Sequence, residues 1–292
     1  MSAIGSAPRA ARLRAGAFRG VLLACLGLSV LMLVVILVDI VLDGMDLISL
    51  NFLTNYASTF NQDESGIRAA LLGTIWLMGV VAVFIVPVGV ATAVYLEEYA
   101  DSTRWFNRMI EVNIQNLAAV PSIVYGILGL AFLVRGPFGQ GNVVLAGGLT
   151  LGLLVLPVVI IAGREAIRAV PSSIREGSMA LGATQWQTIR RQVLPAAIPG
   201  IATGVILALS RAIGETAPLI VVGAATFVAF DPGLFSSFTA LPIQIFDWIG
   251  RPPNENVDFP ALAATAILVL MILLLAMNTV AIWLRNRYEQ KW

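Results

Sequence analysis

The chain contains no histidine, one cysteine and one lysine among 292 residues, and only 12% of its residues are charged. The absence of histidine excludes imidazole metal sites and histidine-based acid–base catalysis. Cys25 has no second cysteine with which to form an internal disulfide. The single lysine, Lys291, is followed by Trp292, so the chain lacks the lysine and hydroxyl residue that end a P-loop. We therefore expect no metal site and no ATP-hydrolysing centre in this chain.

Apolar sequence, by contrast, is abundant. Hydrophobic residues make up 58% of the chain, and they fall in runs of about 20 residues or more, the length that crosses a hydrocarbon core. We expect an all-α polytopic membrane protein. The first run is too long for a signal peptide, and no small-residue cleavage site follows it. The expected organisation is a disordered tail at 1–19, a transmembrane domain at 20–292 with spans at 20–42, 69–95, 110–134, 143–162, 196–227 and 261–284, and a polar segment at 164–195. The fifth run is longer than a perpendicular crossing needs and is expected to be tilted or broken.

The arginines indicate the orientation of these spans. With the N-terminus inside, the cytoplasmic side carries the four tail arginines and the five arginines of the polar segment. It also carries Arg104 and Arg108 of the other inner loop, and Arg285, Arg287 and Lys291 near the C-terminus. The opposite side carries only Arg68, Arg135 and Arg251, and its loops are acidic. Because basic residues concentrate on the cytoplasmic side of membrane proteins, both termini are expected to be cytoplasmic.

The polar segment is too charged and too broken to span a membrane, and its spacing predicts two short helices. Ser173 and Glu176 have the S-x-x-E spacing of a capping box. Gly182 suits the left-handed residue that ends a helix, and Thr184 and Gln187 form a second box. One face of the first helix is expected to present Ile174, Gly177, Ser178 and Leu181.

This helix–turn–helix pattern has two interpretations. It is either a structural loop lying on the membrane or a docking element for a cytoplasmic partner. A role in reading DNA is not expected, because the flanking spans hold the segment against the bilayer.

The fifth run carries two charges, Arg211 and Glu215, which lie on one helical face because they are four residues apart. Each charge costs at least about 2.5–3.5 kcal/mol at membrane depth, so the two face a cavity or each other. One interpretation is a structural ion pair. The other is a waypoint for an anion, since a guanidinium offers forked donors that suit phosphate oxygens. Glu215 would then hold Arg211 and accept a hydrogen bond from protonated phosphate, which sulfate cannot donate.

Several motifs resemble those of a known family, the A-type permease subunits of bacterial phosphate-specific (Pst) ABC importers. The motif R-A-x-G-E-T followed by A-P-L, which begins at Arg211, is similar to theirs. So are YLEEYA at 95–100, NLAAVPSIVYGILGL at 116–130, ALPIQIFDW at 240–248 and the ending LRNRYEQKW. The polar segment resembles the EAA loop of ABC importer permeases, which supplies the coupling helix, on the spacing of Glu176, Gly182, Leu194 and Pro195.

The resemblance implies a six-span type I ABC importer permease of the MetI-like fold in the bacterial inner membrane. It implies a C-type permease partner, an ATPase subunit dimer that binds ATP and Mg, and a periplasmic phosphate-binding protein. The chain itself would bind no cofactor and no nucleic acid. The substrate path is assigned to Arg211 and Glu215, and coupling to the ATPase is assigned to Ser173, Glu176, Gly182, Ala183, Leu194 and Pro195.

Three other functions are to be weighed against the sequence. A permease for sulfate or molybdate would share the coupling loop, but would not be expected to carry the Arg211–Glu215 pair in this context. A secondary transporter or channel would need no coupling loop and no ATP. A membrane-embedded enzyme finds no support, since the chain shows no nucleophile–base constellation and no metal-ligand cluster.

Overall fold

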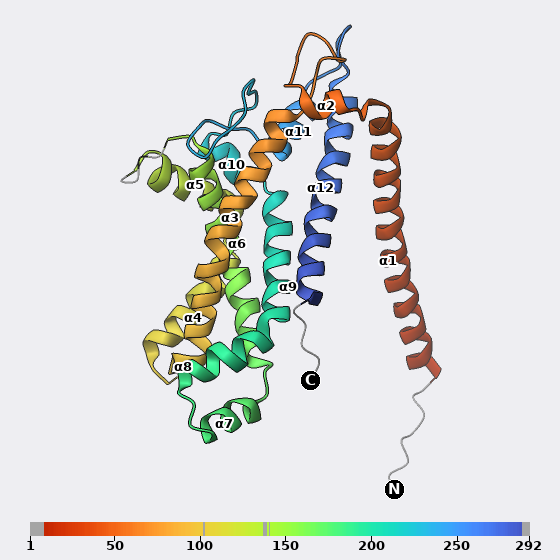
Figure 1. Ribbon diagram of the computed structural model, residues 1–292. Helices are drawn as coiled ribbons and strands as arrows, with labels where there is room; N and C mark the ends of the chain where they lie inside the picture. Colours follow the sequence, from red (N-terminus) through yellow and green to blue (C-terminus); the bar gives the residue numbers. More distant parts are fainter. Residues whose placement is uncertain (1–8, 102, 137–138, 140, 288–292) are drawn as a thin grey trace.

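The computed structural model describes residues 9–101, 103–136, 139 and 141–287, and every regular element within them is helical. In Figure 1 the long helices stand side by side, with α7 and α8 at one end and α2, α10 and α11 at the other. We call these the α7 end and the α11 end. The elements are α1 (Arg9–Gly44), η1 (Met45–Leu47), α2 (Leu50–Thr54), α3 (Arg68–Val94), η2 (Tyr95–Tyr99), α4 (Trp105–Ala118), α5 (Ser122–Gly129), η3 (Leu130–Val134), α6 (Val144–Arg168), α7 (Ser172–Ala180), α8 (Gln185–Thr188), η4 (Ile189–Val193), α9 (Leu194–Ile213), α10 (Ala217–Val222), α11 (Leu241–Ile249) and α12 (Phe259–Arg287).

The predicted all-α polytopic class is confirmed. Among the described residues, five helices are long and apolar enough to cross a membrane: α1, α3 with η2, α6, the continuous α8–η4–α9, and α12. The α4 helix and the α5–η3 segment pass the same test only as a pair, and they make a sixth span if the pair is counted as one. Each of the six predicted apolar runs therefore corresponds to one of these helices or pairs.

The third run departs from the single helix expected at 110–134. The α4 and α5 helices are bent by 105° at the break between Ala118 and Ser122. Pro121 lies at this break and has no N–H to donate, and it disfavours helical backbone in the residue before it. The run is therefore two helices with a sharp bend between them, as in a broken span or a re-entrant loop.

The fifth run is also broken, as expected, and its first helix ends well before the last apolar residue of the run. The helix ends at Ile213, and a short helix, α10, begins again at Ala217. Gly214 caps the first helix and Pro218 lies in the first turn of the second. Residues 223–240, which include the end of the predicted run, form loop.

The N-terminal segment corrects a further expectation. The α1 helix begins at Arg9, so residues 9–19 are helical although disorder was predicted there; residues 1–8 lie outside the described structure. Alanine, arginine and leucine are strong helix formers, and they make up most of this segment. In Figure 1 α1 stands apart from the other helices along most of its length. It meets α12 at the α11 end, where Thr265 Oγ1 donates to the carbonyl of Gly44 at 3.1 Å.

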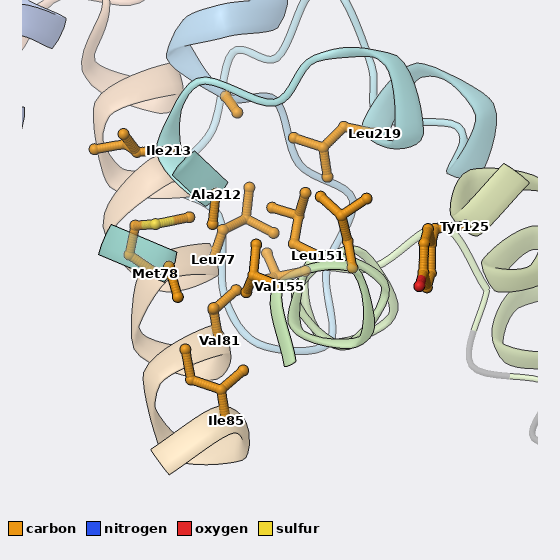
Figure 2. Close-up of a cluster of buried hydrophobic side chains, with 14 of the residues drawn as sticks. Leu77, Met78, Val81, Ile85, Tyr125, Leu151, Val155, Ala212, Ile213 and Leu219 are labelled. Atoms are coloured by element: carbon orange, nitrogen blue, oxygen red, sulfur yellow. The ribbon is translucent and has the colours of Figure 1, made fainter. Parts of the chain in front are cut away.

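The core of the bundle lies between α3, α6 and α9, as Figure 2 shows for Leu77, Val81, Leu151 and Ala212. Small residues allow these helices to approach closely. On α9, Gly200 and Gly204 face Ala166 and Ala162 of α6, and a Cβ at either glycine would collide with them. Close packing through small residues is the usual way in which helices associate in membranes.

A polar clasp joins two loops at the α11 end. Arg68 donates from Nε and Nη2 to the two carboxylate oxygens of Asp231, at 2.7 and 2.6 Å, and the Tyr56 hydroxyl donates to the same carboxylate at 3.0 Å. The Arg68 guanidinium also lies over the Tyr56 ring. The hydrogen bonds from Arg68 hold the pKa of Asp231 below its usual value.

Candidate functional site

The polar segment folds as helix, turn, helix, but the capping box predicted at Ser173 and Glu176 is wrong. The α7 helix begins at Ser172 and its N-cap is Pro171, with no side-chain cap. Pro171 has extended backbone (φ −56°, ψ 140°), so the helix starts directly after it and Ser173 lies inside the first turn. Glu176 is exposed on α7.

The two other predicted signals, the helix end at Gly182 and the helix start at Thr184, are confirmed. Gly182 has φ +85°, a left-handed conformation that side chains disfavour. Its N–H donates to the Met179 carbonyl at 2.9 Å and the Ala183 N–H donates to the Ser178 carbonyl at 3.2 Å, which is a Schellman motif. At the start of α8, Thr184 and Gln187 form the predicted capping box.

The face predicted for the first helix borders a cavity of about 430 Å³ between α7 and the following helix. Of the residues assigned to coupling, Ser173 and Ala183 line this cavity. The other lining residues are Ile174, Gly177, Ser178, Leu181, Gln187, Arg191 and Gln192. The cavity is thus a hollow of mixed polarity, open to a partner of the α7 end.

Leu194 and Pro195 lie elsewhere. The fifth span was expected to begin at 196, directly after Pro195, but the helix runs without a break from Gln185 to Ile213. Pro195 is tolerated in the first turn of α9, which the π-helical turn η4 precedes. Leu194 packs against an apolar cluster that contains Ile167 and Ile189. Leu194 therefore connects the second helix to the membrane-spanning body, and neither residue lines the cavity.

An ion-pair network joins α3, α4 and α6 at the α7 end. Arg168 donates from Nε and Nη2 to both oxygens of Glu97, each at 2.9 Å. Arg164 donates to Glu111 at 2.8 Å, and its Nε lies 3.5 Å from Glu97. The side chains of Arg164 and Glu97 are only 14% and 15% exposed. These arginines are engaged by carboxylates on neighbouring helices.

A second pair joins α7 to the end of α3. Arg175 donates to Glu98 Oε1 from Nε at 3.0 Å and from Nη2 at 2.7 Å. The same guanidinium donates to the carbonyls of Val170 and Ile167, at 2.6 and 2.9 Å. Gln185 of α8 donates to the main-chain carbonyl of Glu98 at 2.7 Å.

The Arg211–Glu215 pair is present at the break between α9 and α10, and the Arg211 side chain is more exposed than those of Arg164 and Arg175. Arg211 Nε donates to Glu215 Oε1 at 3.2 Å, and the two side chains are 43% and 20% exposed. Within the described parts of the chain, this is the one protein hydrogen bond of the Arg211 side chain. The terminal guanidinium nitrogens are therefore free to bind an anion as far as described residues go.

The residues that sequence reasoning missed are Glu97, Glu98 and Glu111, all acidic and all paired to arginines of 164–175. A signal was available: carboxylates are scarce in this chain, yet two are adjacent at the end of an apolar run. Within the described residues, no group of three His, Cys, Asp or Glu side chains could hold a metal ion.

The chain matches the family model described as binding-protein-dependent transport system inner membrane component over residues 85–292. It is 38% identical over 225 residues to the phosphate transport system permease protein PstA 1 of Mycobacterium tuberculosis, covering 77% of this chain and 72% of that protein. It is 31% identical over 279 residues to the probable ABC transporter permease protein YqgI of Bacillus subtilis, covering 91% and 93%.

Among solved structures, the fold is similar to a chain of a bacterial alginate ABC transporter in complex with an alginate pentasaccharide-bound periplasmic protein. The TM-score is 0.68 at 14% identity, over 95% of this chain and 96% of that one. This likeness concerns the fold alone. Taken with the family match and the relatives, it shows that the chain belongs to the binding-protein-dependent transport system inner membrane components, the non-catalytic permease subunits of ABC importers.

Proposed function

We propose that this chain is the A-type permease subunit of an ATP-driven importer of inorganic phosphate. The observation that carries the proposal is the half-exposed Arg211 guanidinium at a helix break, which donates a single hydrogen bond to the Glu215 carboxylate. The similarity to PstA 1, a phosphate transport permease by name, supports the same substrate.

The chemistry of the pair suits phosphate. A guanidinium presents its donors as a fork that matches two oxygens of a tetrahedral anion. Glu215 neutralises Arg211 when no anion is bound, and it accepts a hydrogen bond from the protonated oxygen that phosphate carries near neutral pH. Sulfate has no such proton, so its oxygen would face the carboxylate of Glu215 unfavourably. The pair therefore supplies both attraction for the anion and selection for phosphate.

The α7–α8 element is the proposed docking site for the ATPase subunit, with Ser173, Glu176, Gly182 and Ala183 at its surface or turn. Leu194 and Pro195 hold it to α9. Because this end carries most of the arginines of the chain, it faces the cytoplasm in the bacterial inner membrane, and both termini lie on that side. A C-type permease forms the other half of the path, and the ATPase dimer binds the ATP and Mg.

The proposed cycle is alternating access. A periplasmic phosphate-binding protein docks on the acidic loops of the α11 end and delivers phosphate. ATP binding by the partner subunits moves α7 and α8, the path opens outward, and phosphate passes Arg211 on its way in. No step of hydrolysis takes place on this chain.

ATP-dependent uptake of labelled phosphate tests the function. Membrane vesicles would hold this chain with its candidate permease, ATPase and binding-protein partners, and sulfate and molybdate would be added as competitors. We expect uptake that requires ATP and resists a large excess of sulfate. Uptake blocked by sulfate or molybdate would assign the chain to another anion, and uptake driven by an ion gradient without ATP would overturn the coupling role.

A further inference from the structure

The α7 helix has little packing of its own against the membrane-spanning body. No residue of Ser172–Ala180 is buried, and the helix packs mainly against α8 and η4. Ile174 reaches the apolar cluster of the α7 end as a partly buried side chain. Apart from this contact of Ile174, a movement of α7 needs another connection to reach α3 and α6.

Arg175 supplies that connection. It is the residue of α7 that bonds directly to the end of α3, through Glu98, and to the last turn of α6 and the linker, through the carbonyls of Ile167 and Val170. Its guanidinium thus links three segments with four hydrogen bonds. Glu98 is 9% exposed and Arg175 is 21% exposed, so the pair is screened by water far less than a surface ion pair.

Glu98 lies in a segment of π-helical backbone. It lies in η2, the π-helical turn that ends α3, and the main-chain carbonyl of Glu98 also accepts a hydrogen bond from Gln185 of α8. The side chain of Glu98 therefore contacts α7 while its main chain contacts α8. Single π-helical turns within or at the end of α-helices are frequent at functional sites.

We propose that Glu98 and Arg175 are positioning residues that transmit the movement of the coupling element to α3. The inference rests on the proposed docking of the ATPase subunit at α7 and adds the route by which a movement of α7 reaches α3. A push on α7 displaces the Arg175 guanidinium, which draws Glu98 and the η2 turn with it, and α3 follows because η2 continues its helix. Neither residue touches the transported anion.

The test uses the complete transporter in vesicles, with phosphate uptake and ATP hydrolysis measured together. Glu98→Gln keeps the size of the side chain and an acceptor oxygen but removes the charge. We expect the number of phosphates carried per ATP to fall by about 2- to 30-fold, the range of effects measured for mutations along coupling routes. Glu98→Asp, which keeps the charge, should restore part of the ratio.

Asp101→Asn is the matched control. Asp101 lies three residues beyond Glu98 in the same connection, and its carboxylate bonds Thr103 and not α7. Its variant should leave the ratio unchanged. A purely structural role of Glu98 predicts a different outcome, in which less complex assembles while each assembled complex carries phosphate at the normal ratio. That result would overturn the proposal.

A second readout does not depend on which solute is carried. Spin labels on α7 and on the α7 end of α3 report their separation before and after ATP binds. The two labels should keep their distance in the unmodified chain and change it in Glu98→Gln. A constant distance in both would overturn transmission through the pair, even where phosphate proved to be the wrong substrate and the uptake assay showed no transport.

Discussion

The chain holds two groups of charged side chains inside or next to its helical bundle, and they are built in opposite ways. At the α7 end, Arg164 and Arg168 are paired with carboxylates of other helices, and the Arg164 and Glu97 side chains are mostly buried. At the break after α9, the half-exposed Arg211 side chain donates one hydrogen bond, to Glu215 four residues further along the chain.

The two groups differ in how many hydrogen-bond donors of each guanidinium remain unused. An arginine whose donors are used by carboxylates stabilises the contact between helices, and an anion would have to displace those carboxylates to bind. An arginine with unused donors on an exposed surface can bind an anion without breaking the fold. We therefore propose a structural role for the first group and substrate contact for the second.

The largest effect is expected from Arg164→Ala, which tests whether the first group is structural. The variant leaves Glu97 without one partner and Glu111 without its ion pair. We expect a loss of about 2–3 kcal/mol of stability, at or below the cost of breaking a buried pair, since Glu111 is partly exposed. Thermal unfolding in detergent measures it. Arg108→Ala, at an exposed position on α4, is the control, and an equal melting temperature for both variants would contradict the structural role.

Glu215→Gln tests selection by the second group. The glutamine amide can donate a hydrogen bond, so the variant no longer disfavours an anion that lacks a proton. We expect sulfate to inhibit phosphate uptake about tenfold more effectively than in the unmodified transporter, in line with about 1.5 kcal/mol for a hydrogen bond to a charged group. Competition curves with sulfate measure this. Unaltered resistance to sulfate would remove Glu215 from the selection step.

Gly182→Ala sharpens the comparison at the turn between α7 and α8. A Cβ there meets no neighbouring atom, so the cost comes only from the left-handed backbone and should be about 1 kcal/mol. We expect a small drop in melting temperature together with weaker association of the ATPase subunit, measured by co-purification. Gly177→Ala, which is also unobstructed but has no left-handed backbone, is the control. Equal association in both variants would count against the turn as part of the docking site.

The smallest effect is expected at the clasp of the α11 end. Because the pKa of Asp231 is lowered in the folded protein, its contribution to stability is present above the pKa of the unfolded chain and is lost as the pH falls through the folded pKa. Thermal unfolding from pH 7 to pH 3 should therefore show a difference between Asp231→Asn and the unmodified chain at neutral pH. The difference should shrink toward pH 3. A constant difference across that range would contradict the ion-pair account.

The sequence was sufficient to predict the membrane-spanning runs and some of the helix starts and ends. Runs of apolar residues are visible without a structure, and Gly182, Thr184 and Gln187 act within a few residues of their partners. The predicted box at Ser173 failed because Pro171 already determines where α7 begins. Hydropathy also could not separate a straight span from a bent one, so the 105° break at Pro121 was missed.

Long-range pairing was beyond a single sequence. Arg175 and Glu98 are 77 positions apart, and nothing in either local pattern identifies the other. The short helix α11 was missed for a related reason: it has only nine residues, and its packing against α3 and α12 decides that it is helical. Arg211 and Glu215 were expected on one helical face, but α9 ends at Ile213 and Glu215 lies in the break after it. The exposure of Arg211 depends on this helix end.

The central claim is that Arg211 binds the transported anion while the arginines of the α7 end do not. The most direct measurement compares phosphate uptake by Arg211→Gln with that of Arg104→Gln, an exposed arginine of the loop before α4, at equal amounts of assembled transporter. The account predicts that Arg211→Gln loses uptake by about 10- to 100-fold, the equivalent of one or two charged hydrogen bonds, and that Arg104→Gln is normal. Normal uptake by assembled Arg211→Gln would contradict the account.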